Sequence, residues 1–239
     1  MSPTTEQNDG PAASGGVAGR SVLVAGATGG LGSAIAADLA ARGARLTLVA
    51  RDDERLAALD VPGHKLALDL RDPQACEAAI AAAHGQAGRL DVVVNAVGVV
   101  AFGMVAELSS DVMEELFLTN TFVPIMLSRA ALGSMTDGGV IVNISGVVAE
   151  QGLAGMAAYG ASKAAVRSFD EALGREARRR RIRVIDARPP HTETGLATRP
   201  IAGQAPKMPV GLDPARVAAI ICDAIAGDAV DLPSGAFGP

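Results

Sequence analysis

A chain of 239 residues with 49% hydrophobic residues can bury a sizeable core, which suits one large α/β domain and excludes a wholly disordered protein. The net charge of −5 and the isoelectric point of about 5.2 give a mildly acidic surface, which disfavours nucleic acid as a partner. The two cysteines lack metal-site spacing, and no uninterrupted apolar run approaches the roughly 18 residues of a membrane span, so we expect no metal, no membrane contact and a cytoplasmic location.

Residues 1–19 are rich in small and polar residues without periodicity, which is typical of a disordered tail ahead of a single domain over 20–239. Beyond them, short apolar runs alternate with helical patterns. Strands are predicted at Ser21–Ala25, Leu46–Ala50, Lys65–Leu68, Val92–Val94, Val140–Ile144 and Arg183–Ala187. Helices are predicted from the first glycine-rich turn to Arg42, over Asp53–Leu59, from Pro73 to about His84, over roughly Asp111–Ser134 and over Tyr159–Arg180. This alternation predicts an α/β fold with a doubly wound parallel sheet and helices on both faces.

A glycine-rich turn, Ala25–Gly32, joins the first predicted strand to the first predicted helix. Glycines allow a tight turn there, and they let backbone N–H groups at the helix N-terminus approach a pyrophosphate. A purely structural turn is the alternative, but the position at the first strand–helix junction favours a nucleotide site. The residues expected to contact the nucleotide are Gly26, Thr28, Gly29, Gly30, Leu31 and Gly32.

The end of the second strand indicates which dinucleotide binds. An NAD site usually places an acid there to bond the ribose 2′-OH, whereas this strand is followed by Arg51. A guanidinium is suited to a 2′-phosphate, which favours NADP(H) over NAD(H). An ordinary surface arginine is the alternative, and the neighbouring acids Asp52 and Asp53 weaken the NADP(H) interpretation.

Two residues after the third strand are further candidates for the nucleotide site. Asp69 is placed to bond the adenine amino group, and Leu70 lies beside it. The helix that begins at Pro73 is better capped by Asp72 than by Asp69. Asp69 is therefore free to serve the nucleotide.

The only tyrosine of the chain, Tyr159, precedes Lys163 by four residues on a predicted helix, so the two side chains share one helix face. A phenol titrates at about pH 10 in water, which is too high for efficient acid–base work at neutrality. A neighbouring ammonium and a nicotinamide cation would stabilise the phenolate and lower its pKa. The alternative is a surface tyrosine beside an unrelated lysine. The pair alone does not distinguish a catalytic site from this alternative.

The motifs taken together resemble the short-chain dehydrogenase/reductase family over essentially all of residues 20–239. The matching features are the glycine turn, Asp69, the run Asn95-Ala96-Val97-Gly98, Asn120, the pair Tyr159 and Lys163, and the segment Pro189–Thr194. The resemblance implies a Rossmann fold, and hydride transfer between a nicotinamide cofactor and a carbonyl or secondary alcohol.

The resemblance also implies roles for individual residues. Tyr159 would exchange a proton with the substrate oxygen, Lys163 would hold the nicotinamide ribose and lower the pKa of Tyr159, and Asn120 would hold a water that links Lys163 to solvent. The segment at about 195–213 would form a lid over a small apolar substrate, and the chain would assemble as a homodimer or homotetramer. The residues expected to line the cofactor are Asn95, Ala96, Val97, Pro189, Thr192 and Thr194, with Tyr159 and Lys163.

The family's catalytic serine is the main departure. It normally stands thirteen residues before the tyrosine, a register that holds Gly146 here, with Ser145 one residue earlier. Because neighbouring strand residues point to opposite faces, Ser145 replaces it only if the strand end bulges or the next loop carries an extra residue. Ser145 is a candidate catalytic residue on that condition. A missing hydroxyl would cost about 2–4 kcal/mol in similar sites.

Two other functions remain open. A catalytically weak dinucleotide-binding protein that acts as a sensor or scaffold is favoured by Gly146, and it is opposed by Tyr159, Lys163 and Asn120. A dehydratase or epimerase on a related fold is disfavoured, because such chains generally carry a longer C-terminal substrate domain.

Overall fold

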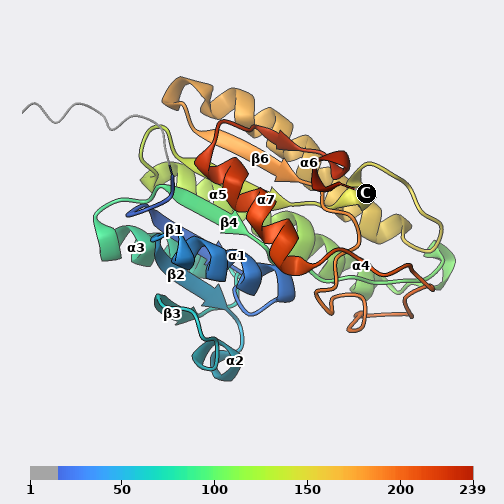
Figure 1. Cartoon of the computed structure of the whole chain (residues 1–239). Coiled ribbons are helices and arrows are strands. Elements are labelled where there is room, and N and C mark those ends of the chain that lie inside the picture. Colours follow the sequence, from blue (N-terminus) through green and yellow to red (C-terminus); the bar gives the residue numbers. More distant parts are fainter. Residues whose placement is uncertain (1–15, 239) are drawn as a thin grey trace, which may run out of the picture.

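The protein is described by a computed structural model over residues 16–238 (Figure 1). Seven strands form one sheet in the order β3-β2-β1-β4-β5-β6-β7, and every neighbouring pair is parallel. The strands are β1 Ser21–Ala25, β2 Arg45–Ala50, β3 His64–Ala67, β4 Val92–Asn95, β5 Val140–Ile144, β6 Arg183–Ala187 and β7 Asp231–Leu232. The predicted doubly wound parallel sheet is confirmed.

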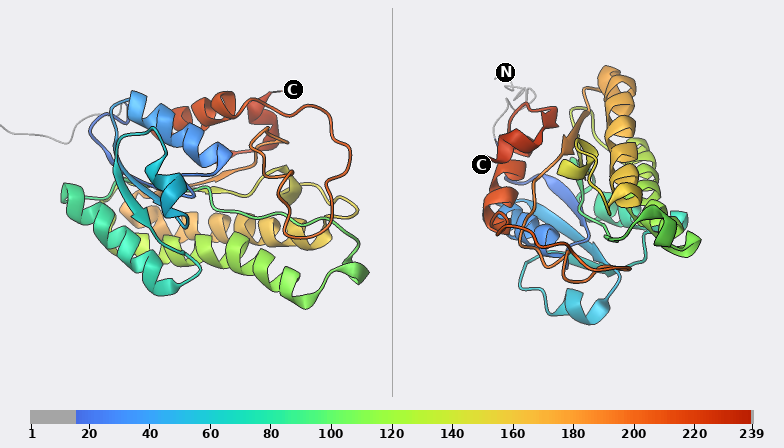
Figure 2. Two further views of the ribbon diagram at one scale, coloured as in Figure 1. Left: turned by 90° about the horizontal axis from the view of Figure 1, so that it is seen from below. Right: turned by 90° about the vertical axis from the view of Figure 1, so that its right-hand side faces the viewer.

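Helices cover both faces of the sheet (Figure 2). Helices α1 and α7 pack on one face, and α3, α5 and α6 pack on the other, each face with its own apolar layer. The helices are α1 Gly30–Ala41, α2 Asp53–Ala57, α3 Pro73–Ala87, α4 Ser110–Phe117, α5 Val123–Ser134, α6 Ala157–Glu176 and α7 Pro214–Ala226. Both cysteines, Cys76 and Cys222, are buried in these layers.

Local sequence signals set where several helices begin. The Asp72 carboxylate accepts the backbone N–H of Gln74 at 2.9 Å, and Pro73 starts α3, as the sequence predicts. Side chains cap α2, α4 and α7 in the same way. Helix α3 ends at Gly88, whose φ of +68° is the left-handed conformation common at helix ends.

The helix predicted over Asp111–Ser134 is interrupted, which the sequence pattern did not show. A π-helical segment, Leu118–Phe122, separates α4 from α5. Within it, Asn120 bonds the backbone of Val99 and the Ser162 hydroxyl, contacts made with distant parts of the chain. Hydrogen bonds to distant parts of the chain can widen one turn of a helix, and such π segments are frequent at functional sites.

The same stretch, Ser110–Ser134, is long and apolar enough to cross a bilayer by length and composition alone. Half of it is buried inside the fold, and α5 packs its apolar face against α3 and the sheet. A core helix passes the same test, and this packing accounts for its apolar character.

The two ends of the predicted domain differ from the sequence expectation. Residues 1–15 of the predicted tail lie outside the described residues, but Val17 is buried in the core and the Gly19 N–H donates to the Gly43 carbonyl at 2.8 Å. Ordered packing therefore begins before residue 20. Beyond the last predicted strand, the structure adds α7 and β7.

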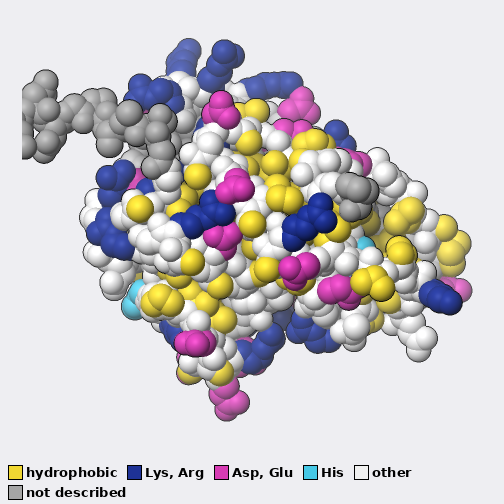
Figure 3. All heavy atoms as spheres, in the orientation of Figure 1, with side chains coloured by type: hydrophobic (Ala, Val, Ile, Leu, Met, Phe, Trp, Pro, Cys, Tyr) yellow, Lys and Arg dark blue, Asp and Glu magenta, His cyan; other side chains and the backbone are white. Residues whose placement is uncertain are grey.

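Arginine side chains gather at the C-terminal end of α6 (Figure 3), where residues 178–181 are all arginine. Positive charge is favourable at this end of a helix dipole. Arg180 also donates to Asp137 at 2.9 Å and to the Leu132 carbonyl at the end of α5. The basic run thus ties α6 to α5.

Candidate active site

The candidate site lies at the carboxyl ends of β1 and β4, which are neighbours in the sheet although β2 and β3 come between them in the chain. Ligands of such sheets bind at this kind of switch point. The glycine turn follows β1, and the loop Asn95–Gly98 follows β4. A Cβ on Gly26 would lie 2.8 Å from the Ala96 carbonyl carbon, and φ is +77° there, so only glycine lets the two loops touch.

The start of α1 forms a cradle of backbone N–H groups. A Cβ on Gly32 would lie 2.1 Å from the Gly26 carbonyl oxygen, so the turn closes only with glycine at this position. No side chain of the described residues caps α1, whereas side chains cap α2, α3, α4 and α7. The first N–H groups of α1, near Gly30 and Leu31, therefore suit an external anion. This cradle fits the pyrophosphate of a dinucleotide.

The expected adenosine end of the site carries several charges. The Asp69 carboxylate accepts hydrogen bonds from Arg71 at 2.5 to 3.0 Å, and Arg71 also bonds Glu115 of α4 at 3.1 Å. The guanidinium of Arg71 is the main cause that lowers the pKa of Asp69, and the charge of Arg51 adds to it. Arg51 is exposed at the end of β2, and its charge is close enough to lower the pKa of Asp69. Leu70, the residue after Asp69, is buried.

Arg55 is a residue that the sequence analysis missed. From α2, its guanidinium donates to the carbonyl oxygen of Thr28 in the glycine turn at 2.7 Å. Arg55 thereby places a guanidinium against the glycine turn. No local pattern singles out Arg55, because the bond joins α2 to a turn 27 residues earlier.

Tyr159 lies on the first turn of α6 and is only 8% exposed. Its ring belongs to an apolar cluster with Val100, Phe102 and Leu116, against which Leu196 packs. Burial raises the pKa of Tyr159 to about 12, and burial is the whole cause. Lys163 was expected to lower the pKa of Tyr159, and the cofactor-free protein does not show this effect.

Lys163 lies one helical turn further along and is 5% exposed. Its Nζ donates to the carbonyl oxygen of Ile144, the last residue of β5, at 2.7 Å. Burial lowers the pKa of Lys163 to about 8, and the negative charge of Asp186 opposes this shift. The ammonium is thus fixed at the carboxyl end of the sheet.

Asn120 joins Lys163 at the loop after β4. A Cβ on Gly98 would lie 3.4 Å from both the Asn120 Oδ1 and the Lys163 Nζ, which places the two polar groups around one glycine. The Asn120 Oδ1 accepts the Val99 N–H at 2.9 Å, and its Nδ2 donates to the Ser162 hydroxyl at 3.0 Å. The structure therefore brings Tyr159, Lys163 and Asn120 to one end of the sheet.

The remaining expected cofactor residues lie along the same edge. The Asn95 Oδ1 accepts the Val97 N–H at 3.1 Å, and the Ala96 N–H donates to the Ala25 carbonyl at 2.9 Å. These bonds fix the loop after β4 against the end of β1.

The segment after β6 closes on the glycine turn. The Pro189 carbonyl accepts the Val147 N–H at 3.0 Å, and the Thr192 hydroxyl donates to the Pro190 carbonyl at 2.9 Å. A Cβ on Gly30 would lie 2.5 Å from the Thr194 carbonyl oxygen, so Thr194 packs directly on the start of α1.

The predicted lid, residues 195–213, runs over the Tyr159 cluster without helix or strand. Two of its backbone hydrogen bonds join it to the loop after β4: the Phe102 N–H donates to the Ala202 carbonyl at 2.9 Å, and the Ile201 N–H donates to the Val100 carbonyl at 2.8 Å. Val210 of this segment is 92% exposed. The part of the lid near Leu196 and Ala202 is the part that contacts the cluster.

The structure does not bring Ser145 into this group. Its hydroxyl is 1% exposed and donates to the Asp186 carboxylate of β6. Strand β5 ends at Ile144, and Gly146 follows Ser145 with φ +90° and ψ 165°. The N–H groups of Ser145 and Gly146 both donate to the Ala187 carbonyl, at 3.0 and 3.2 Å, which is the pattern of a β-bulge at the strand end. The backbone condition for Ser145 is therefore present, but its hydroxyl is bonded to the neighbouring strand.

Replacing Gly146 with alanine should destabilise the protein by about 1–3 kcal/mol, because this backbone conformation is almost restricted to glycine. Urea unfolding measures the effect. Gly152→Ala is the matched control, since Gly152 is exposed and its added Cβ would meet nothing within 4 Å. Equal losses in the two variants would contradict the assigned strain. The same strain accompanies a serine at position 146.

A buried carboxyl on α6, Asp170, is also absent from the sequence-based candidates. It is 4% exposed; its Oδ1 accepts from the Asn143 amide at 2.6 Å, and its Oδ2 has no hydrogen-bond partner among the described residues. Burial raises the pKa of Asp170 to about 8. The folded protein therefore holds this group protonated at neutral pH.

This protonation makes the stability of the fold depend on pH. The unfolded chain ionises Asp170 above about pH 4, so the stability linked to its proton is complete below that pH and is lost as the pH rises to about 8. Asp170→Asn removes the loss and should stabilise the protein at pH 8 by about 1–4 kcal/mol, with a smaller gain at pH 5. Urea unfolding at both pH values tests this, with exposed Asp60→Asn as control. A gain independent of pH would contradict it.

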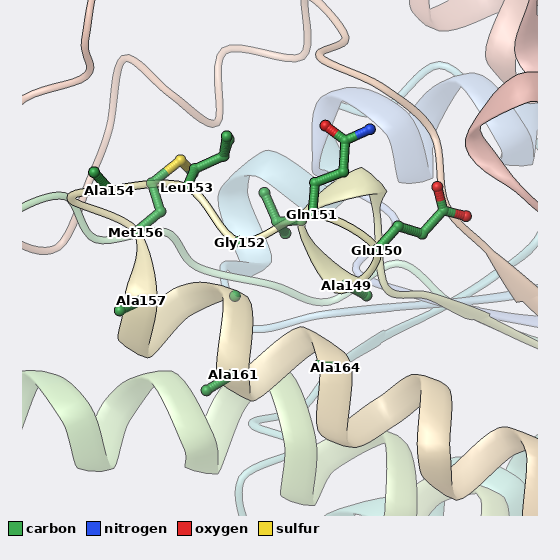
Figure 4. Close-up of a pocket in the computed structure, with 12 residues that line it drawn as sticks. Ala149, Glu150, Gln151, Gly152, Leu153, Ala154, Met156, Ala157, Ala161 and Ala164 are labelled. Carbon is green, nitrogen blue, oxygen red and sulfur yellow. The ribbon is translucent and has the colours of Figure 1, made fainter.

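A separate cavity of about 420 Å³ lies outside the first turns of α6 (Figure 4). The loop Ala149–Ala154 forms one wall, and small residues of α6, among them Ala157, Ala161 and Ala164, form the other. Tyr159 and Lys163 are not among its lining residues. This cavity is therefore distinct from the candidate active site.

Comparison with known proteins is consistent with this geometry. The chain matches the family described as short chain dehydrogenase over residues 20–204. The granaticin polyketide synthase putative ketoacyl reductase 1 of Streptomyces violaceoruber is 37% identical over 190 residues, covering 74% of this chain and 69% of the relative. The 3-oxoacyl-(acyl-carrier-protein) reductase FabG of Escherichia coli (strain K12) is 32% identical over 184 residues, covering 74% of this chain and 75% of the relative.

A solved structure extends the likeness to the whole fold. A short chain dehydrogenase from Burkholderia cenocepacia J2315, in complex with NADP, superposes with a TM-score of 0.80 at 26% identity, covering 93% of this chain and 99% of that one. Fold and site define a dinucleotide-binding α/β protein. This chain belongs to the short-chain dehydrogenase/reductase family, and it is an NAD(P)-dependent oxidoreductase that acts on a CH–OH or C=O group.

Proposed function

We propose that the protein is an NADP(H)-dependent carbonyl reductase or alcohol dehydrogenase with Tyr159 as the proton-exchanging group. One observation carries the proposal: Tyr159 and Lys163 are both buried on one face of α6, and Lys163 reaches the end of β5 beside Asn120 and the loop after β4. An apolar fold gains nothing by burying a phenol and an ammonium together, so chemistry is the better explanation of the pair.

The bound cofactor would supply a hydride donor or acceptor at its nicotinamide ring. Tyr159 gives its proton to the substrate oxygen during reduction and takes it back during oxidation. Lys163 bonds the nicotinamide ribose. In the cofactor-bound protein its charge and that of the oxidised nicotinamide stabilise the phenolate, an effect that the pKa of Tyr159 in the cofactor-free protein does not show. Asn120, fixed by Val99 and Ser162, orients a water that exchanges protons with Lys163.

The remaining expected residues hold the cofactor in this proposal. Backbone N–H groups of the glycine turn, from Gly26 to Gly32, bind the pyrophosphate, and Asp69 with Leu70 borders the adenine. Three residues of the loop after β4, Asn95, Ala96 and Val97, and three of the segment after β6, Pro189, Thr192 and Thr194, line the nicotinamide half.

The surroundings of Tyr159 favour an apolar substrate. Val100, Phe102 and Leu116 share its cluster, and Leu196 packs against it. The relatives are named as reductases of ketoacyl and 3-oxoacyl groups. We propose a ketone on an apolar chain, or the matching secondary alcohol, as the substrate class.

The preference for NADP(H) rests on Arg51, with Arg55 as a second guanidinium near the glycine turn. Arg51→Ala should lower kcat/KM for NADPH by about 10- to 100-fold, the effect of one lost charge-assisted hydrogen bond, and leave that for NADH almost unchanged. Steady-state kinetics with both cofactors and one apolar ketone measures this. Equal losses with both cofactors would refute a contact to the 2′-phosphate. Arg45→Ala, at the opposite end of the same strand, is the control.

A catalytically weak dinucleotide-binding sensor or scaffold is the second candidate. The Ser145 hydroxyl, which is bonded to Asp186, and Gly146 at the register of the family's serine favour it, because they leave the substrate oxygen without that serine donor. Cofactor binding without turnover of any ketone in a broad panel distinguishes it from the reductase.

Assembly and location complete the proposal. We propose a cytoplasmic homodimer or homotetramer, with the small exposed residues Ala157, Ala161 and Ala164 of α6 in the contact. Small residues permit close helix approach. Light scattering coupled to size-exclusion chromatography gives the mass of the particle directly.

A further inference from the structure

A buried polar network lies beside Lys163 at the carboxyl ends of β5 and β6. The Ser145 hydroxyl donates to one oxygen of the Asp186 carboxylate, and Arg188 donates to the other. All three residues are at most 5% exposed. Central strands of parallel sheets are normally apolar on both faces, so ionised groups on β6 are costly there unless they serve a purpose.

The backbone of β5 connects this network to Lys163. The Lys163 Nζ donates to the Ile144 carbonyl at 2.7 Å, and Ser145 is the next residue. Across the sheet, Ile144 pairs with Ala187, the neighbour of Asp186. The ammonium and the carboxylate form no ion pair within 4.0 Å among the described residues, but the charge of Asp186 raises the pKa of Lys163 against the effect of burial.

The other charged groups around Asp186 do not cancel the electrostatic effect of its carboxylate on Lys163. Directly after β6, Arg188 also donates to Asp231 of β7 at 2.7 Å and to Glu150 after β5, so two further carboxylates compensate its charge. On α6, Asp170 faces Asp186 but is held protonated at neutral pH. Burial raises the pKa of Asp186, while the donors Ser145 and Arg188 oppose that shift.

We propose that Asp186 is a positioning residue for Lys163: its buried carboxylate, held by Ser145 and Arg188, keeps the ammonium charged at the candidate active site. Ser145 thereby serves the lysine through Asp186 and does not touch the substrate. The inference rests on the proposed function only for its catalytic consequence. The charge state of Lys163 is a property of the free protein and is measured without cofactor or substrate.

The chain has three lysines, Lys65, Lys163 and Lys207, so the full-length protein labelled with 13C at lysine Cε gives three NMR signals. Lys65→Arg and Lys207→Arg assign them by elimination. In Asp186→Asn, the titration midpoint of Lys163 should fall by about one pH unit or more, a tenfold change in its proton affinity. Asp231→Asn is the matched control: it removes another carboxylate bonded to Arg188 and should leave the midpoint unchanged.

A second variant guards against misfolding of the first. Ser145→Ala keeps the carboxylate and removes only its hydroxyl donor, so the midpoint should move in the same direction by less. A midpoint that is unchanged in Asp186→Asn, or that shifts equally in Asp231→Asn, overturns the proposal. A 100-fold loss of activity in Ser145→Ala at every pH, without a shift in Lys163, assigns the hydroxyl to the substrate and also overturns it.

The consequence for activity is a separate measurement. Reduction requires charged Lys163, so in Asp186→Asn the high-pH decline of kcat/KM should move to lower pH by the same amount as the NMR midpoint. A shifted midpoint with an unshifted decline leaves the electrostatic inference standing and counts against Lys163 in the proposed mechanism. Absence of all reductase activity in the parent protein refutes the proposed function alone.

Discussion

Tyr159→Phe is expected to lower kcat/KM for NADPH-dependent ketone reduction by about 10²- to 10⁴-fold, the usual contribution of a positioned general acid. The phenol lies within the apolar cluster at the candidate site, and the substitution removes only its oxygen. Because the ring stays, the packing against Phe102 and Leu196 is kept. NADPH oxidation, followed by absorbance, measures the loss.

Cofactor binding is the control for this variant. NADPH fluorescence is measured readily, since the chain has no Trp. Tyr159→Phe should bind NADPH within about threefold of the parent protein, because Tyr159 acts on the reacting oxygen and the glycine turn supplies the affinity. Retained turnover in this variant would show that another group provides the proton. Lost binding would instead show that Tyr159 shapes the cofactor site.

Lys163→Met should lower kcat/KM by about 10- to 1,000-fold, the effect of losing a neighbouring charge that shifts a pKa by 1–3 units. Methionine has a similar length and no charge, so it fills the buried space but cannot bond the Ile144 carbonyl or a ribose hydroxyl. In contrast to Tyr159→Phe, the affinity for NADPH should also fall. Parallel kinetics and fluorescence titrations separate the two effects.

Lys65→Met is the matched control for Lys163→Met. Lys65 donates to the carbonyls of Ala57 and Leu59, outside the candidate site. Its replacement should leave kcat/KM unchanged. If both variants lose activity alike, the effect follows from general destabilisation, and the role of Lys163 is not supported. Thermal unfolding of each variant confirms that the fold is intact.

Six of the seven strands were predictable from the sequence because each of them is a short apolar run with its own turn signal, whereas β7 was not among the predicted strands. Predicted and observed strand ends agree within one residue, as at Val92–Asn95 and His64–Ala67. The π segment around Asn120 was not predictable. It depends on hydrogen bonds from Asn120 to Val99 and Ser162, which lie 21 and 42 residues away. A local sequence pattern does not reveal bonds over such distances along the chain.

The residues of the candidate site were predictable where a local sequence motif contains them. They were not predictable where contacts between distant parts of the chain set the direction of a side chain. Tyr159 and Lys163 follow from helix geometry. The direction of the Ser145 side chain depends on where β5 ends. Its hydroxyl donates to the Asp186 carboxylate, and this hydrogen bond fixes that direction. A charge inside the apolar run Arg183–Ala187 was a visible signal for Asp186. Its other partner, Arg188, could be interpreted only once the folded strands placed Asp231 beside it.

The central claim is that hydride passes between the cofactor and a carbonyl carbon beside Tyr159. Reduction of an apolar ketone with NADPH carrying deuterium at nicotinamide C4, on the transferred face, tests it most directly. Mass spectrometry of the alcohol should show one deuterium on the former carbonyl carbon, and none should appear when the label is on the opposite face. Tight NADPH binding with no deuterium in any product would contradict the claim.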